Sequence, residues 1–392
     1  MKLKKIFLAL LSSTLLSAAG IAHSADKLKV GFMTTLSGPN SVLGADVRDG
    51  FNLGVKHSGE KLGGIDLELF VADDQQNPET GRQTVERFIK REKVDVITGV
   101  VASNVLLPVL PAVLASDIIY LSPNTGPADY AGSKCNKNFF AVAWQNEDIP
   151  NAMGKYAMSR DLKRVALIAP NYPGGRESLQ GFKRQFKGEI VEEIYTSISQ
   201  MDFASELSTI RAAKPEAVFF FLPGGMGVNF IRQFAASGMG KNVALLAPGF
   251  SADVDTINAV GESMVGLRNS SQWAADLDNE ANKKFVADFT STYGRAPTMF
   301  AAQGYDTARL IDSAVSAVNG KIEDLDAFRA AFHKADFQSV RGDFQFNRNN
   351  FPIQDIYVRE VVKAESGELK NKLVGTILED HSDAFVSECS MQ

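Results

Sequence analysis

Residues 27–39 are Lys27-Leu-Lys-Val-Gly-Phe-Met-Thr-Thr-Leu-Ser-Gly-Pro39, and the segment after them has a different hydrophobic period. In the first segment Leu28, Val30 and Phe32 alternate with other residues, as in a β-strand. In the second, apolar residues recur every fourth position, as on one face of a helix, at Leu43, Val47, Phe51 and Val55. The sequence therefore predicts a strand, a loop and a helix, in that order.

The same alternation continues along the chain. Further strands are predicted at 65–71, 94–98 and 118–121, with helices between them. A second series begins after residue 145, with strands predicted at 164–169, 190–195, 217–222 and 243–246. Alternating strands and helices favour parallel strands with right-handed crossovers, covered by helices on both faces. We therefore predict an α/β fold class with two doubly wound parallel-sheet lobes.

The length of 392 residues favours two domains, because a single core usually stops growing at about 250–300 residues. Helices predicted at 280–293, 299–319 and 325–333 have few strands between them, so they cover sheets that are already built. We expect the chain to cross between the lobes near residues 145, 270 and 350, which makes a three-crossover hinge. The predicted domains are residues 1–24 as a signal peptide, 25–145 plus 270–350 as lobe 1, and 146–269 plus 351–392 as lobe 2.

The first residues have the pattern of a removable export signal. Lys2, Lys4 and Lys5 form a positive region, and the apolar run Ile6–Leu16 is too short to span a bilayer. Small residues in Ala22-His-Ser24 suit a signal peptidase, so we expect cleavage after Ser24. A retained membrane anchor is the less favoured alternative, because no stop-transfer run follows.

Composition argues against nucleic acid as a partner and against a metal site or other cofactor. The formal net charge is −5, and the three lysines of the signal do not count in the mature chain, so its charge is about −8. The histidines beyond the signal stand far apart and beside no cysteine pair, at His57, His333 and His381.

The two cysteines, Cys135 and Cys389, are predicted to form a disulfide that pins the C-terminus. Two thiols in an exported protein more often form a disulfide than a metal pair or free nucleophiles. Two buried free cysteines are the alternative.

Motifs for catalysis are incomplete, so we do not expect an enzyme. The segment Gly224-Gly-Met-Gly227 lacks the third glycine of a dinucleotide fingerprint, and Arg176–Gln180 lacks the glycines that flank a hydrolase nucleophile. The adjacent acids Asp73 and Asp74 point to opposite faces at a strand end, where such residues commonly form turns or caps.

Ligands of open parallel sheets bind beyond the carboxyl ends of the strands, so the residues that follow each strand are candidates. A helix N-terminus presents unpaired N–H donors, so Ser103 and Asn104 are suited to hold a carboxylate without a cationic side chain. Capping of helices and turns is the alternative role. The candidates of lobe 1 are Ser37, Ala102, Ser103, Asn104, Ser122, Asn124 and Thr125.

Lobe 2 offers an aromatic and glycine-rich set that suits a flat apolar body. Trp144 and Trp273 lie near the proposed crossovers, where each either closes over a ligand or packs the hinge. The run Phe219–Phe221 is assigned to core packing, as is usual in a strand buried on both faces. The candidates of lobe 2 are Tyr172, Gly175, Pro223, Gly224, Gly249 and Phe250.

Nearly the whole mature chain resembles the type I periplasmic substrate-binding proteins of ABC importers, in the branched-chain amino-acid (Leu/Ile/Val) receptor group. The resemblance implies two lobes joined by three crossover strands that close on a ligand as a clamp. It also implies a monomer in the periplasm, no cofactor, and an ABC permease in the inner membrane as partner. The matching segments, in chain order, are Val30–Phe32, Thr35–Pro39, Thr98–Ser103, Leu121–Thr125 and Gly261–Gly266.

The resemblance places the family's carboxylate-binding serine at Ser103 and its threonine near Thr125. The turn that carries the family's ammonium-binding acid aligns with Ala247-Pro-Gly249, where no acid is present. A buried ammonium without a counter-charge costs several kcal/mol, so an α-amino acid is a poor ligand unless Asp253 or Glu177 substitutes.

The C-terminal segment Val340–Asp355, with the terminal cysteine, resembles the branch of the group that binds aromatic acids. The preferred ligand is therefore a small aromatic carboxylate of the benzoate or cinnamate kind. The alternatives are a branched-chain or other amino-acid binding protein of the same importer class, and the ligand-sensing subunit of a signalling complex.

Overall fold

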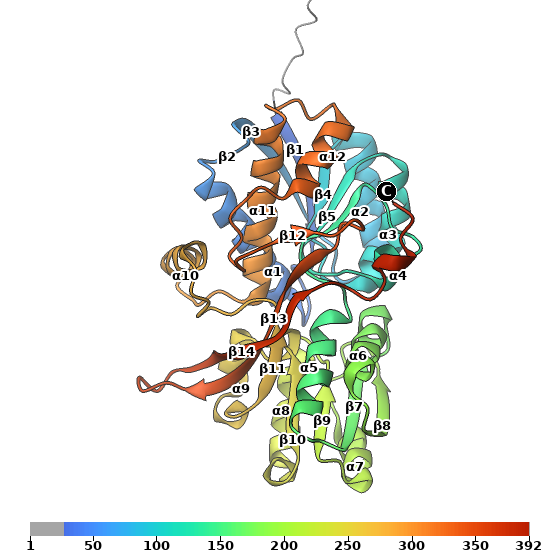
Figure 1. Ribbon diagram of the computed structural model, residues 1–392, viewed down its shortest axis with the longest axis vertical. Helices are drawn as coiled ribbons and strands as arrows, with labels where there is room; N and C mark the ends of the chain where they lie inside the picture. Colours follow the sequence, from blue (N-terminus) through green and yellow to red (C-terminus); the bar gives the residue numbers. More distant parts are fainter. Residues whose placement is uncertain (1–26, 392) are drawn as a thin grey trace, which may run out of the picture.

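The computed structural model describes residues 27–391, which form two α/β lobes stacked along the long axis of the molecule (Figure 1). Lobe 1 has a six-stranded sheet in the order β2-β3-β1-β4-β5-β6, in which only the β2–β3 pair is antiparallel. The elements are β1 (Lys27–Thr34), α1 (Ser41–His57), β2 (Lys61–Leu62), β3 (Ile65–Asp73), α2 (Pro78–Arg87), η1 (Phe88–Glu92), β4 (Val96–Thr98), α3 (Ser103–Ala115), β5 (Ile119–Ser122), α4 (Ala128–Ala131), β6 (Phe139–Ala141), α10 (Glu280–Tyr293), α11 (Met299–Ala317) and α12 (Leu325–Lys334).

Lobe 2 has an eight-stranded sheet in the order β12-β13-β11-β10-β9-β7-β8, with β14 paired to β13. The five strands β7 to β11 are parallel to one another, whereas β13 pairs antiparallel with β11, β12 and β14. Its elements are α5 (Asp148–Ser159), β7 (Arg164–Pro170), α6 (Pro173–Gln185), β8 (Glu189–Thr196), α7 (Ala204–Ala213), β9 (Ala217–Phe220), α8 (Gly225–Ala236), η2 (Met239–Lys241), β10 (Ala244–Pro248), η3 (Gly249–Ser251), α9 (Val254–Val260), η4 (Glu262–Met264), β11 (Arg268–Ser271), β13 (Pro352–Lys363) and β14 (Leu369–His381). Two further elements lie against lobe 1: the edge strand β12 (Gln345–Phe346), whose Phe346 packs on Phe140, and η5 (Val386–Glu388) of the C-terminal tail.

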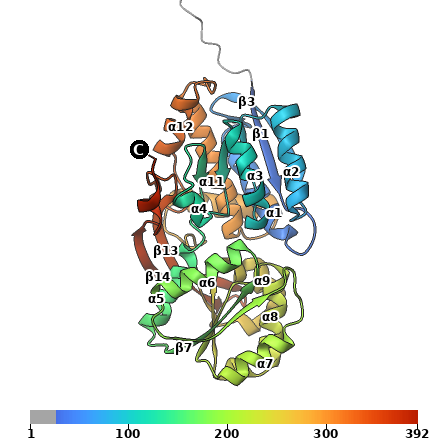
Figure 2. The ribbon, with the colours of Figure 1, turned by 90° about the vertical axis from the view of Figure 1, so that its right-hand side faces the viewer.

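Each sheet is covered on both faces, as parallel sheets require (Figure 2). On one face of lobe 1, Val30 and Phe32 of β1 pack against α1 and α11, while Met33 on the opposite face packs against α2 and α3. Helices α1 and α11 cross closely because both carry glycine at the crossing. A Cβ atom added at Gly50 would lie 1.9 Å from the carbonyl oxygen of Ala301, and one at Gly304 would lie 1.9 Å from that of Val47.

A buried ion pair joins the segments that run between the lobes. Asp306 of α11 accepts from Nε of Arg341 at 2.9 Å and from Oγ of Ser339 at 2.6 Å. Arg341 Nη1 also donates to the carbonyl oxygen of Val142 at 2.8 Å and to Gln354 Oε1 at 2.8 Å. The first and third crossovers are therefore held by one guanidinium.

The C-terminal tail returns to lobe 1 after β14. Cys135 and Cys389 form a disulfide, with 254 residues of sequence separation, as predicted. Asn349 Nδ2 donates to Asp383 Oδ2 at 2.9 Å, and Arg348 donates to the carbonyl oxygen of Val386 at 2.7 Å. The domain prediction assigned residues 351–392 to lobe 2, whereas these contacts attach the tail after β14 to lobe 1. The chain thus crosses between the lobes a fourth time.

The predicted signal peptide lies outside the described residues. Within residues 27–391, no helix combines the length and the apolar character needed to cross a bilayer.

Candidate functional site

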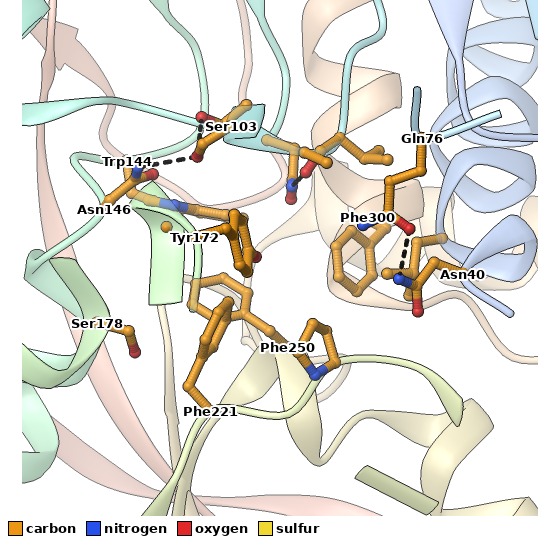
Figure 3. A pocket seen from close by; sticks show the side chains of 17 residues that line it. Asn40, Gln76, Ser103, Trp144, Asn146, Tyr172, Ser178, Phe221, Phe250 and Phe300 are labelled. Atoms are coloured by element: carbon orange, nitrogen blue, oxygen red, sulfur yellow. Dashed lines mark hydrogen bonds between the residues drawn. The ribbon is translucent and has the colours of Figure 1, made fainter. Parts of the chain in front are cut away.

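The candidate site is a pocket between the lobes, at the carboxyl ends of the parallel strands, which encloses about 570 Å³ including space open to solvent (Figure 3). Loops after β3, β4 and β5 bring polar residues from lobe 1, and loops after β7, β9 and β10 bring mostly aromatic residues from lobe 2. This is the position expected for a ligand of two open parallel sheets.

Short hydroxyl and amide groups form one end of the pocket. Ser103 Oγ and Thr125 Oγ1 are 2.9 Å apart, and Asn146 Nδ2 donates to Ser103 Oγ at 3.3 Å. Ser103 is the first residue of α3, and the first amides of a helix have no acceptor within it. The hydroxyls and this helix terminus together form a set of donors suited to a carboxylate.

An acid lies behind this end of the pocket but does not line it. Glu177 accepts from Asn146 Nδ2 at 2.5 Å and from the backbone N–H of Ala128 at 3.2 Å. Burial raises the pKa of Glu177 to about 7, against the opposing effect of these hydrogen bonds. Glu177 thus orients Asn146, whose Oδ1 accepts from the N–H of Gly126 at 2.8 Å.

Aromatic rings surround the middle of the pocket, and Figure 3 shows Trp144, Tyr172, Phe221, Phe250 and Phe300 around one space. Trp144 and Phe250 have ring centroids 4.7 Å apart, and Phe221 meets Phe250 edge-on at 5.5 Å. Tyr172 lies 6.3 Å from Phe221. Burial raises the pKa of Tyr172, so its hydroxyl stays protonated at neutral pH. Rings at these angles form flat apolar walls.

The lobes also touch beside the pocket. Asn40 Nδ2 donates to Gln76 Oε1 at 2.8 Å within lobe 1. On the other side Asn40 faces Gly224 of lobe 2, where an added Cβ atom would lie 2.3 Å from Asn40 Oδ1. Gly224 has φ +60°, a conformation that favours glycine. Both this backbone conformation and the close contact with Asn40 therefore require a residue without a side chain at this position.

The pocket lining is uncharged: no Asp, Glu, Lys, Arg or His is among the described residues that form it. Asp253, named from the sequence as a possible partner for an ammonium, accepts instead from the N–H groups of Val254 at 2.9 Å and Met299 at 2.7 Å. Glu177 instead accepts hydrogen bonds from Asn146 and from the backbone N–H of Ala128. Neither acid lines the pocket.

Seven of the predicted ligand-binding residues line the pocket. They follow five different strands, and the sequence alone could not show that these strand ends meet: Ala102, Ser103, Asn124, Thr125, Tyr172, Pro223 and Phe250.

Six predicted ligand-binding residues do not line the pocket. Ser37 is exposed to solvent, Asn104 Nδ2 donates to the carbonyl oxygen of Gln76 at 3.3 Å, and Ser122 Oγ donates to that of Thr125 at 2.5 Å. The glycines instead allow close packing. An added Cβ would lie 2.0 Å from the Pro170 carbonyl oxygen at Gly175, 2.3 Å from Asn40 at Gly224, and 2.7 Å from the Met299 sulfur at Gly249.

The sequence prediction missed several residues that line the pocket, and it left the role of Trp144 undecided between the ligand and the hinge. Trp144 lines the pocket, whereas Trp273 packs in the hinge and donates from Nε1 to Asn282 Oδ1 at 2.7 Å. Phe221 had been assigned to core packing, but β9 ends at Phe220, so its ring reaches the pocket. The other missed residues are Asn40, Leu43, Gln76, Val101, Asn146, Gly174, Ser178 and Phe300.

Comparisons with known proteins agree with this architecture. Residues 27–367 match the family described as periplasmic binding protein. The Leu/Ile/Val-binding protein homolog 6 of Brucella melitensis is 26% identical over 388 residues, which cover 95% of this chain and 97% of that protein. A solute-binding protein of an ABC transporter from R. palustris, solved in complex with benzoate, is 31% identical. Its TM-score is 0.88, over 93% of this chain and 99% of that chain. Another from Rhodopseudomonas palustris BisB5, in complex with 3,4-dihydroxybenzoic acid, is 27% identical with a TM-score of 0.84, over 92% and 99% of the two chains.

Proposed function

Because the chain belongs to the periplasmic binding protein family, we propose that it captures a small aromatic carboxylate, such as a benzoate or cinnamate, for an ABC permease. The predicted resemblance and the two-lobed α/β fold class are confirmed. The chain is a solute-binding protein of the ABC transporter class and not an enzyme, as expected. The nature of the ligand, the permease, the monomeric state and the site of signal cleavage belong to the proposal.

The observation that carries the proposed ligand is an uncharged aromatic pocket that has, at one end, a set of hydrogen-bond donors suited to bind a carboxylate. An amino acid would bring an ammonium into a space whose described lining holds no acid, at a cost of several kcal/mol. A carboxylate would meet Ser103, Thr125 and the N-terminus of α3. A ring would lie among aromatic side chains that prefer tilted or edge-on contacts.

Capture would proceed by closure of the lobes without any covalent step. Lobe 1 supplies the groups for the carboxylate, and lobe 2 brings Tyr172, Phe221 and Phe250 against the ring. The ligand binds the closed form better than the open form, so it shifts the population toward closure. A permease that recognises the closed form would then receive only loaded protein.

A panel of ligands separates this proposal from an amino-acid receptor. We expect benzoate, hydroxybenzoates or cinnamates to raise the thermal midpoint, whereas leucine, isoleucine and valine leave it unchanged. A ligand at about 100 times its Kd stabilises the folded state by about 2.7 kcal/mol, which a thermal shift resolves. A shift with leucine alone would contradict the proposal and favour the function in the name of the Brucella relative. A ligand-sensing role would be indicated if the closed form bound a chemoreceptor instead of a permease.

Replacement of Ser103 by alanine is expected to weaken the binding of the aromatic acid by about 1–2 kcal/mol, the scale of one hydrogen bond to a charged group. The affinity is measured by titration calorimetry. Ser116→Ala, at the exposed opposite end of α3, is the matched control and should bind as the wild type does. Equal affinities for the two variants would remove Ser103 from the carboxylate site.

A further inference from the structure

Two carboxyl groups from different lobes meet beside the ligand pocket. Asp46 belongs to α1 of lobe 1 and is fully buried, whereas Asp255 belongs to the first turn of α9 in lobe 2. Asp255 lines the same hollow as Thr298, and Thr298 Oγ1 donates to Asp46 Oδ2 at 2.7 Å, so the two carboxyl groups lie close together and the charge of Asp255 acts on Asp46. Carboxylates only accept hydrogen bonds, so a direct bond between the two groups would require a proton on one of them.

The groups around Asp46 do not remove this requirement. Arg295 lies 2.7 Å from Asp46 Oδ1, but its second nitrogen lies 2.7 Å from Asp49 Oδ2, so one cation serves two acids of lobe 1. Thr298 Oγ1 donates to Asp46 Oδ2 at 2.7 Å. Approach of Asp255 therefore adds an acid to a cluster whose positive charge is already used.

The groups around Asp255 add more negative charge. Asp253 precedes it at the start of α9, and its own oxygens already accept from the N–H groups of Val254 and Met299. Arg359 lies 3.8 Å from Asp253 and donates to Asn269 Oδ1 at 2.8 Å and to the carbonyl oxygen of Trp273 at 3.2 Å. Asp255 Oδ2 is buried and has no hydrogen-bond partner among the described residues. Ionisation of both Asp46 and Asp255 would place two like charges in contact in a poorly solvated place.

The position of the pair links it to closure. Asp255 lines a hollow between the lobes that shares Leu43, Phe250 and Phe300 with the ligand pocket. Because α1 and α9 belong to different lobes, separation of the lobes moves the two carboxyl groups apart. Asp46 then keeps Arg295 and Thr298, which are both on its own lobe.

We propose that Asp46 and Asp255 form a proton-dependent latch, so that closure of the lobes around the ligand takes up a proton. The part of this inference that concerns ligand affinity rests on the proposed function, and the part that concerns closure does not. Protein with a protonated pair closes readily, whereas protein with two ionised groups must overcome their repulsion.

The expected direction with pH follows from the state of each group. Burial, and next the charge of Asp255, raise the pKa of Asp46 to about 8 in the closed form, and burial also raises the pKa of Asp255. Apart, each group tends toward an ordinary aspartate pKa of about 4. Closure therefore takes up a proton between these limits, and affinity falls as pH rises through that window, by up to about tenfold per pH unit.

The test is calorimetric titration with benzoate from about pH 6 to about pH 8, where benzoate is ionised. Two buffers of different ionisation enthalpy count the protons taken up. The wild type should lose affinity as pH rises and take up close to one proton. Asp255→Asn, whose amide can donate to Asp46 without a titrating proton, should lose most of this slope and of the proton uptake.

Two controls isolate the pair. Glu262→Gln removes an exposed acid of lobe 2, which pairs with Lys363, and should keep the wild-type slope. Glu177 titrates in the same range, and it contributes equally to the wild type and to Asp255→Asn, so the difference between them reports the latch. Equal slopes and equal proton uptake in these two proteins would overturn the inference.

A ligand-free measurement separates failure of the latch from failure of the proposed ligand. Paired fluorophores on the two lobes report their separation as pH is varied without ligand. If benzoate does not bind at any pH but the lobes approach as pH falls in the wild type and not in Asp255→Asn, the proposed ligand fails and the latch stands. A lobe separation that responds identically to pH in both proteins would overturn the latch.

Discussion

Asp306→Asn is expected to lower the free energy of unfolding by about 3–5 kcal/mol, because it leaves the Arg341 guanidinium buried without its counter-charge. Both side chains are almost completely inaccessible to water, with exposed fractions of 2% for Arg341 and 0% for Asp306. Burial raises the pKa of Asp306 and lowers that of Arg341, and the attraction between them opposes both shifts. The loss is larger than that of an ordinary ion pair because water cannot replace the missing partner.

Urea denaturation followed by circular dichroism measures this loss. Asp326→Asn is the matched control, because Asp326 pairs with Arg329 while its own side chain is 89% exposed, and it should change stability by less than about 1 kcal/mol. Similar midpoints for the two variants would show that the hinge does not depend on the buried pair. Because Arg341 also binds Val142 and Gln354, we expect Asp306→Asn to loosen the relative orientation of the lobes as well.

Replacement of both Cys135 and Cys389 by serine is expected to lower the free energy of unfolding by up to about 5 kcal/mol. The disulfide closes a loop with 254 residues of sequence separation, and the entropy lost by an unfolded chain increases with the length of the closed loop. The same change loosens the C-terminal tail, whose other contacts with lobe 1 include hydrogen bonds made by Asn347, Arg348 and Asn349 and the packing of Phe385 against the core of lobe 1.

The unfolding midpoint in urea, with and without a reducing agent, tests this expectation. The wild type should lose stability when it is reduced, whereas the double serine variant should not respond. Equal midpoints for the oxidised wild type and the variant would mean that the tail contributes nothing to global stability. The outcome also shows whether the C-terminal tail, which crosses back to lobe 1, unfolds together with the rest of the protein.

Much of the fold could be predicted because it is local. The change from a period of two to a period of about four after Pro39 marks the boundary between β1 and α1, and Asn77 caps α2 with two side-chain hydrogen bonds. The long antiparallel hairpin of β13 and β14 was not predicted, since it depends on pairing between distant segments such as β11 and β13. The return of the tail to lobe 1 likewise depends on contacts made only after folding.

The candidate site could be predicted in part, because topology brings strand ends together. The residues directly after β4, β5 and β7 include Ser103, Thr125 and Tyr172, which line the pocket. The prediction missed pocket residues that do not directly follow a strand of either sheet. One of them is Phe300, which lies in the first turn of α11. Asn146 is another, because the crossover where it lies has no period that marks it as part of a site.

The contact between Asn40 and Gly224 has a kinetic consequence. With these residues in contact between the lobes beside the pocket, a captured molecule would leave only after the lobes separate, so its residence time would follow the opening rate. Substitutions that weaken this contact would therefore shorten the residence time while hardly changing how fast the open form meets its ligand. A membrane partner that separates Asn40 from Gly224 when it binds would therefore speed release of the ligand.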